Sequence, residues 1–406
     1  MAALSPGLRS LPRSVWLLGT ISLLNDSASE MIYPLLPLFL AGTLGAGPRV
    51  LGLIEGLAEA VSSLLKLGAG ALSDRMRRTK PFVVWGYGVA GLARTLIAAA
   101  TGWWMVLLFR LADRVGKGLR SSPRDALLGR SITPEQRGLA FGLHRAMDNA
   151  GAVIGPLVAA SLLALGFELR TVFWCAGVPA LIVLVLTLRL REPEAEALVE
   201  APRFSWRLQG YPPAFKRYLV VLGVFMLGNS STLFLLLRVR DLGISQAQVP
   251  LLWALTSLVA AVFLTPLSSL SDRIGRRRLI IAGWLAYAGI YLLLGWGGLP
   301  AWGVWALFAA FGLFIAATEG AEKAMVADLV PREQLGTAFG WYHLVLGITL
   351  LPASLLFGWL WQSISAFTAF AFGAACALLA AALLGAWMRK ADGGGLERTI
   401  TKASPP

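Results

Sequence analysis

Ionisable side chains occur within stretches of the sequence that are otherwise as apolar as the interior of a lipid bilayer. Placing one charge in such surroundings costs roughly 2.5–3.5 kcal/mol, so we expect these residues to bind protons or to contact a polar solute. Ion pairing between helices is the structural alternative for each. The candidates for a proton-binding or substrate cavity are Asp26, Glu30, Tyr33, Glu55, Glu59, Arg110, Asp113, Arg114, Lys117, His144, Asp148, Asn229, Glu319, Glu322, Lys323, Tyr342 and His343.

Many of these residues recur at intervals of three and four, which places them on one side of a helix. A polar stripe on an otherwise apolar helix should face the interior of a helix bundle. The stripes are Glu55, Glu59, Ser62, Lys66 and Gly70; Arg110, Arg114, Lys117 and Ser121; and His144, Asp148, Gly151 and Gly155.

Asp26 and Glu30 are our first candidates for a group that carries protons. They are four residues apart and therefore share a helical face. Burial disfavours the charged form of a carboxyl group, so one of them is expected to bind a proton near neutral pH. The alternative is a permanent ion pair with Arg110, Arg114 or another base, and the reserve candidates are Glu55, Asp113 and Asp148.

The composition identifies the class of protein that must position these groups. Of 406 residues, 57% are hydrophobic and 14% are charged, against roughly 25% charged in a soluble domain. This excludes soluble, disordered and disulfide-rich secreted folds, and the continuous apolar runs exclude a β-barrel. The net charge of +14 is attributed to basic cytoplasmic loops rather than to nucleic-acid binding. No Walker A, metal-binding or hydrolase motif occurs, so we expect neither an enzyme nor a cofactor.

Twelve apolar runs are long enough to cross a bilayer. Loops 74–80 and 272–278 each carry four basic residues, which places them and, with an even number of spans, both termini in the cytoplasm. The expected organisation is a six-helix bundle over 1–190, a cytoplasmic linker over 191–217, a second bundle over 218–390 and a cytoplasmic tail over 391–406. The runs are 15–42, 50–72, 82–101, 103–122, 139–166, 171–190, 218–238, 249–270, 279–297, 302–326, 337–361 and 366–388.

An internal repeat supports this division into halves. LSDR at 72–75 recurs at 270–273, and AFG at 140–142 recurs at 338–340, both with an offset of 198 residues. Parallel repeats related by an axis along the membrane normal, with a site at their interface, are a known transporter plan.

The two repeated loops resemble the signature loop of the major facilitator superfamily. The first copy departs from it at Arg77, where a glycine is expected, and the second at Ser268. The resemblance implies that the aspartate of each copy caps a neighbouring helix and pairs with basic groups, which latches one conformation. The implied latch residues are Gly70, Asp74, Arg75, Arg78, Asp272, Arg273, Gly275 and Arg276.

Two further elements resemble motifs of the same superfamily. Gly151, Gly155 and Pro156 resemble the antiporter motif of its drug and metabolite exporters, with Ala-Ala in place of the terminal Gly-Gly. Glycines four residues apart also allow close helix packing. Arg114-Val-Gly-Lys117-Gly resembles an element whose arginine is linked to proton handling, with lysine in place of glutamine.

The sequence therefore predicts an all-α membrane protein with twelve helices in two six-helix halves around a central cavity. We expect a monomeric secondary transporter of the prokaryotic inner membrane, with both termini cytoplasmic. It is expected to work by alternating access, driven by the proton gradient, and to export a drug, siderophore or metabolite. Its partners are then the solute, protons and the bilayer, and not nucleic acid. The alternatives are an importer of an organic anion or nutrient, and a receptor or scaffold that does not transport.

Overall fold

The computed structural model describes residues 11–76, 79–132, 137–190, 208, 210–331 and 335–387, and these form helices and connecting loops without a strand. The first group of helices, called the N-half, contains α2 (Arg13–Ile32), η1 (Tyr33–Leu35), α3 (Leu36–Leu38), η2 (Phe39–Thr43), α4 (Pro48–Met76), α5 (Lys80–Leu96), η3 (Ile97–Ala99), α6 (Trp103–Arg130), α7 (Arg137–Ala164), α8 (Leu169–Cys175) and α9 (Gly177–Leu188). The C-half contains α10 (Pro213–Gly228), α11 (Leu233–Asp241), α12 (Val249–Ile274), α13 (Arg276–Trp296), α14 (Ala301–Leu329), α15 (Leu335–Ser363) and α16 (Ala366–Trp387).

The apolar runs expected from the sequence lie mostly within these helices, although the first spans four consecutive elements from α2 to η2 and the run 218–238 includes the non-helical residues 229–232. The first run is interrupted after α2, where Pro34 and Pro37 lack the amide hydrogen that would continue the helix. Backbone polar groups in lipid must bond within their own segment, which favours helices throughout such a chain.

Nine helical segments of the described residues are long and apolar enough to cross a membrane. The three other long helices, α2, α4 and α6, contain most of the acidic and basic residues singled out above. The structure therefore places the charge of the N-half on a distinct set of helices.

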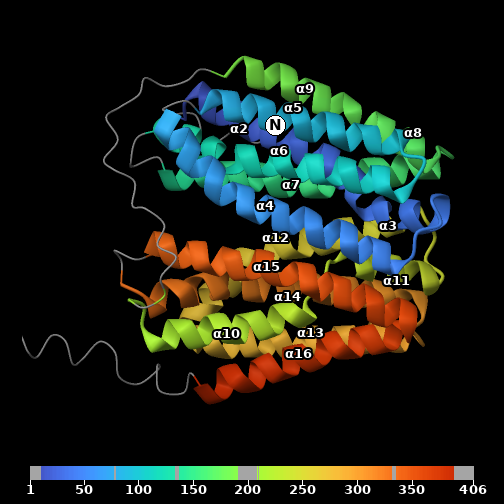
Figure 1. Ribbon diagram of the computed structural model, residues 1–406, viewed down its shortest axis with the longest axis vertical. Coiled ribbons are helices and arrows are strands. Elements are labelled where there is room, and N and C mark those ends of the chain that lie inside the picture. Colours follow the sequence, from blue (N-terminus) through green and yellow to red (C-terminus); the bar gives the residue numbers. More distant parts are fainter. Residues whose placement is uncertain are drawn as a thin grey trace, which may run out of the picture.

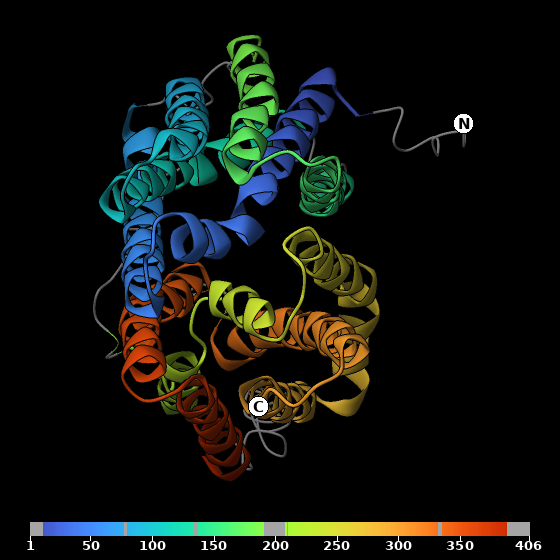
Figure 2. The same ribbon diagram turned by 90° about the vertical axis from the view of Figure 1, so that its right-hand side faces the viewer.

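The two halves pack side by side with their helices roughly parallel to a common axis (Figure 1). Figure 2, which looks along that axis, shows the N-half above the C-half. Two seams join them, since α4 packs against α15 and α7 against α12. At the α4–α15 seam the position of a Cβ on Gly52 is only 2.2 Å from the backbone oxygen of Ser354. The end at which α4, α6, α12 and α14 stop is called the basic-loop end below, and the other is the opposite end.

The glycines of the antiporter-like motif hold α7 against α2. A Cβ on Gly151 would lie 2.5 Å from the backbone oxygen of Leu23, and one on Gly155 would lie 2.4 Å from that of Ser27. Because these contacts are with backbone, any side chain at either position must push the helices apart.

Gly155→Ala is therefore expected to destabilise the protein. Overpacking at a tight contact costs about 1–3 kcal/mol, and we expect a lower melting temperature for the purified variant in detergent. Gly142→Ala is the matched control, because it lies in the same helix and a Cβ there has no atom within 4 Å. Equal melting of both variants and the unmodified protein would show that α2 and α7 do not pack closely.

Candidate functional site

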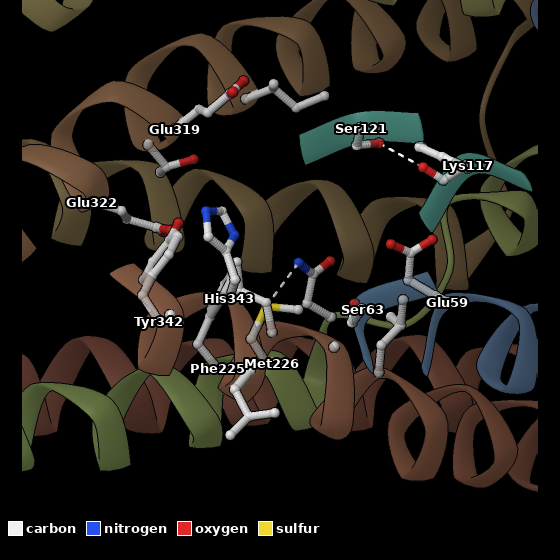
Figure 3. Close-up of a pocket in the computed structure, with 18 of the residues that line it drawn as sticks. Glu59, Ser63, Lys117, Ser121, Phe225, Met226, Glu319, Glu322, Tyr342 and His343 are labelled. Carbon is white, nitrogen blue, oxygen red and sulfur yellow. Dashed lines mark hydrogen bonds between the residues drawn. The ribbon is translucent and has the colours of Figure 1, made fainter. Parts of the chain in front are cut away.

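A cavity of about 820 Å³ lies between the two halves (Figure 3). Its walls come from α4, α6 and α7 of the N-half and from α10, α14 and α15 of the C-half. It extends to Asp125 and Arg145, which are exposed and lie towards the basic-loop end. Of the residues predicted from the sequence, those that line it are Glu59, Lys117, Asn229, Glu319, Glu322, Tyr342 and His343.

The predicted charges of the N-half behind this wall form a chain of ion pairs. Arg110 Nε lies 2.7 Å from Glu55 Oε1, and its Nη1 lies 3.2 Å from Asp113 Oδ2. Arg94 Nη2 lies 2.9 Å from Asp113 Oδ1. All four side chains are buried. These ion pairs therefore link α4, α6 and α5. Glu55 and Asp113, the reserve candidates for the proton carrier, are both paired with arginine.

Three more predicted residues lie towards the cavity and the C-half. Arg114 Nε lies 3.8 Å from Glu59 Oε2. The guanidinium of Arg110 lies 5.4 Å from the centre of the Tyr33 ring, whose hydroxyl is 2.8 Å from that of Thr232 in the C-half. Tyr33 thus connects the buried charges to a contact between the halves.

Asp26 and Glu30 have neutral hydrogen-bond donors instead of cations. Asn25 Nδ2 donates to Asp26 Oδ1 at 2.8 Å, and Trp253 Nε1 of α12 donates to Glu30 Oε2 at 2.7 Å. Within the described ranges neither carboxylate has an ion pair, because Arg110 and Arg114 are engaged by other acids. The alternative of a permanent pair with those arginines is therefore not what the structure contains.

The antiporter-like glycines contact the backbone beside these two acids. A Cβ on Gly151 would lie 3.0 Å from Asp26 Cβ, and one on Gly155 would lie 3.1 Å from Glu30 Cβ. The two carboxylates are thus held at fixed positions by the packing of α2 on α7.

His144 and Asp148 form a separate pair on α7. His144 Nδ1 lies 3.5 Å from Asp148 Oδ2, and the hydroxyl of Ser22 donates to the same carboxylate. Asp148, the third reserve candidate, therefore has two polar partners.

The carboxylates of α14 in the C-half differ in their partners. Glu319 Oε1 lies 2.8 Å from Lys323 Nζ and 3.3 Å from Nη2 of Arg145, so it links the two halves across the cavity. Glu322 instead accepts hydrogen bonds from Trp284 Nε1 at 3.2 Å and from the Tyr342 hydroxyl at 3.1 Å. Asn229 donates to the sulfur of Met226 at 3.6 Å.

Polar contacts join the halves at the opposite end, beyond the cavity. They include the Tyr33–Thr232 and Trp253–Glu30 hydrogen bonds. The backbone amide of Arg49 donates to Gln362 Oε1 at 3.2 Å, and the Arg49 side chain donates to Ser363. Trp253 and Gln362 were not predicted from the sequence, because an indole and an amide are unremarkable residues there. These contacts hold the two halves together at the opposite end.

The comparison with known proteins decides the family. The sequence model of the Major Facilitator Superfamily matches residues 17–239 and 218–404. The chain belongs to this superfamily. An uncharacterised MFS-type transporter of Methanocaldococcus jannaschii is 32% identical over 383 residues, covering 93% of this chain and 95% of that protein. The multidrug resistance protein MdtH of Salmonella newport is 28% identical over 340 residues, covering 82% of each.

Solved structures of other superfamily members share the fold. The nucleoside transporter NupG has a TM-score of 0.75 at 13% identity, covering 93% of this chain and 100% of that one. A POT family transporter in complex with a thioalcohol-conjugated peptide has a TM-score of 0.76 at 11% identity, covering 95% and 99%. The resemblance read from the repeated loops is confirmed, and the chain is a multi-pass membrane protein of a transporter family.

The second copy of the superfamily's signature loop lies among the described residues. Arg276 Nη1 bonds to Asp272 Oδ1 at 2.8 Å, and its Nε bonds to Asp328 at the end of α14. No side chain caps α13, which begins after Gly275 with a φ of +94°. Asp272 therefore has a basic partner of the kind that the resemblance implies, and it does not cap α13. Arg273 is exposed.

The first copy cannot be compared in the same detail. Gly70, Asp74 and Arg75 fall in α4, but the side chains of Asp74 and Arg75 lie outside the described residues, as does Arg78.

Loss of one member of the buried ion-pair chain should destabilise the N-half. Asp113→Asn leaves Arg94 buried without a full counter-charge, which costs about 3–5 kcal/mol. We expect low yield and a lower melting temperature, partly recovered when Arg94→Gln is added. The control is Asp241→Asn, since Asp241 is 48% exposed in its 3.6 Å pair with Arg238, and exposed pairs contribute at most about 1 kcal/mol. A single Asp113 variant as stable as this control would contradict the account.

The signature loop gives a prediction about transport rate. Asp272→Asn removes a charge that Arg276 holds between the ends of α12 and α14, and Asp272 is 62% exposed. We expect unchanged folding and solute binding but slower transport, and the same for Asp74→Asn. The measurement is transport, alongside binding, of a solute that the unmodified protein transports. Transport at the unmodified rate by both variants would remove the latch.

Proposed function

We propose that this chain exports small organic solutes in exchange for protons, by alternating access across the inner membrane of a prokaryotic cell. The observation that carries the proposal is a cavity between two halves, with polar contacts that join the halves at the end away from the basic loops. With twelve spans and with basic loops and termini in the cytoplasm, this conformation is the one that takes up solute from the cytoplasm.

The contacts that close the opposite end suit a reversible gate. They include hydrogen bonds, which water replaces at small net cost when the halves separate. Within the N-half, α2 and α7 meet backbone to backbone at Gly151 and Gly155, so these two helices move together while the gate opens.

Asp26 and Glu30 are the proposed proton carriers. They have no cationic partner among the described residues, so a bound proton removes an uncompensated charge from the membrane interior. An ionised carboxylate accepts a stronger hydrogen bond than a neutral one, so protonation of Glu30 weakens its bond to Trp253 across the gate. Charged groups near Glu30 are Asp26 on its own helix and Arg114 and Lys117 on α6.

The direction of transport is argued from two observations. A relative that covers most of the chain is named a multidrug resistance protein. The motif that resembles the antiporter signature also packs against the two proposed proton carriers. In exchange of protons for solute, binding of one must affect binding of the other. The contact between α7, which carries the motif, and α2, which carries both carboxylates, is a direct means of coupling the two binding events.

An importer of organic anions receives less support. It would depend on the positive charge of α6, but Arg110 pairs with Glu55 and Asp113, and Arg114 pairs with Glu59. A scaffold that does not transport would need neither an internal cavity nor carboxylates without cations in its membrane core.

Proton-driven export can be tested in two steps. Cells with and without the protein are compared for growth in the presence of ethidium, norfloxacin and tetraphenylphosphonium, and the compound with the largest protection becomes the test compound. Its uptake into inverted vesicles is then measured under an imposed pH gradient. Uptake that requires the protein and collapses with the gradient supports export. Uptake that is indifferent to the gradient contradicts proton coupling.

Neutral variants of the two proposed proton carriers should lose proton-driven transport and keep solute exchange. In Asp26→Asn and Glu30→Gln we expect loss of uptake driven by the pH gradient, because the neutral side chain cannot release a proton. Exchange of labelled for unlabelled test compound, without a gradient, should persist. Proton-driven uptake at the unmodified rate in both variants would move the proton site to α4, α6 or α7.

A further inference from the structure

The C-half has one buried carboxylate that lines the cavity and has no cation beside it. Glu322 is 7% exposed, and within the described ranges the donors to its two carboxylate oxygens are the neutral groups of Trp284 and Tyr342. In the part of the chain that the structure describes, no basic nitrogen lies within 4.0 Å of it. Figure 3 shows Glu322 at the cavity wall beside Tyr342. A carboxylate in this position lacks a counter-charge in the empty protein.

Two basic residues close to Glu322, namely Lys323 beside it in α14 and Arg145 on the cavity wall, are already engaged. Lys323 and Arg145 both pair with Glu319, and their side chains are 44% and 55% exposed. Glu319 therefore shares two cations, and neither of them forms an ion pair with Glu322. Since both cations lie with the more exposed acid, the buried end of the cavity carries the negative charge.

Aromatic rings surround this acidic end. Phe225 is stacked on Trp284, with ring centres 4.6 Å apart and planes at 9°, and Phe314 lies 6.2 Å from Phe225. Tyr342 meets His343 edge to face at 5.1 Å. Aromatic faces attract cations, and the attraction grows when both partners are removed from water.

We propose that the cavity binds an organic cation, with its charged group at Glu322 and its apolar body against Phe225 and Phe314. This inference rests on the proposed function, in which the same cavity is the transport site. A bound cation supplies the counter-charge that Glu322 lacks. The rings give apolar contact to the rest of the solute, and the volume of about 820 Å³ admits a body of several rings.

The test compares two probes of nearly the same size and shape but opposite charge, tetraphenylphosphonium and tetraphenylborate. Binding of each is measured to the full-length protein in lipid nanodiscs, with protein-free nanodiscs to subtract partition into lipid. We expect saturable binding of the cation and none of the anion. Absence of saturable cation binding, or an equal site for the anion, overturns the proposal.

Variants assign the effect to Glu322. In Glu322→Gln the dissociation constant for tetraphenylphosphonium should rise about tenfold or more, as expected when a charged contact is lost in a desolvated site. Glu322→Asp keeps the charge and should stay within a few-fold of the unmodified protein. Asp241→Asn makes the same change of net charge outside the cavity and should leave binding unchanged. Equal affinity in the Gln variant and the unmodified protein overturns the assignment.

A separate transport measurement distinguishes failure of this inference from failure of the proposed function. Proton-driven transport of neutral or anionic compounds, in a protein that does not bind the cation, would refute the cation site alone. Saturable binding lost in Glu322→Gln, with no proton-driven transport of any compound, would refute the export mechanism and leave the binding site in place.

Discussion

The ion pairs that run from Glu55 through Arg110 and Asp113 to Arg94 tie α4, α6 and α5 together. A single charge of this kind is expensive in a membrane interior, and breaking a buried pair leaves the other partner uncompensated. These four groups therefore depend on one another for a partner, and the N-half keeps one internal arrangement. The groups that change charge during a transport cycle are then residues outside these ion pairs, above all Asp26 and Glu30.

The helix contacts fall into two groups, those that stay fixed during a transport cycle and those that change. Within the N-half, glycine allows α7 to meet the backbone of α2, so the carboxylates of α2 are held in place. Between the halves at the opposite end, the contacts include single hydrogen bonds such as those of Trp253 and Thr232. One of these bonds ends on a proposed proton carrier. The chemistry of proton binding and the geometry of the gate therefore share one side chain, Glu30.

The positions of the helices could be predicted from the sequence, because a membrane span needs a long apolar run and these runs proved mostly helical. The polar stripes also identified most ionisable residues near the site. The pairing could not be predicted, since it depends on how each helix is rotated against its neighbours. Arg94 was visible as a charge, but its bond to Asp113 was not. Trp253 is 223 residues from Glu30, and no local pattern marks an indole as a partner for a carboxylate.

The central claim, that the charge of Glu30 controls closure of the opposite end, can be tested by the distance between spin labels across that end. Labels at Thr43→Cys and Gln246→Cys, both exposed and in different halves, are introduced after Cys175 and Cys376 are changed to serine. The account predicts a short distance at neutral pH that lengthens as the pH falls, and a long distance at neutral pH in Glu30→Gln. A distance that neither acid nor this substitution changes would contradict it.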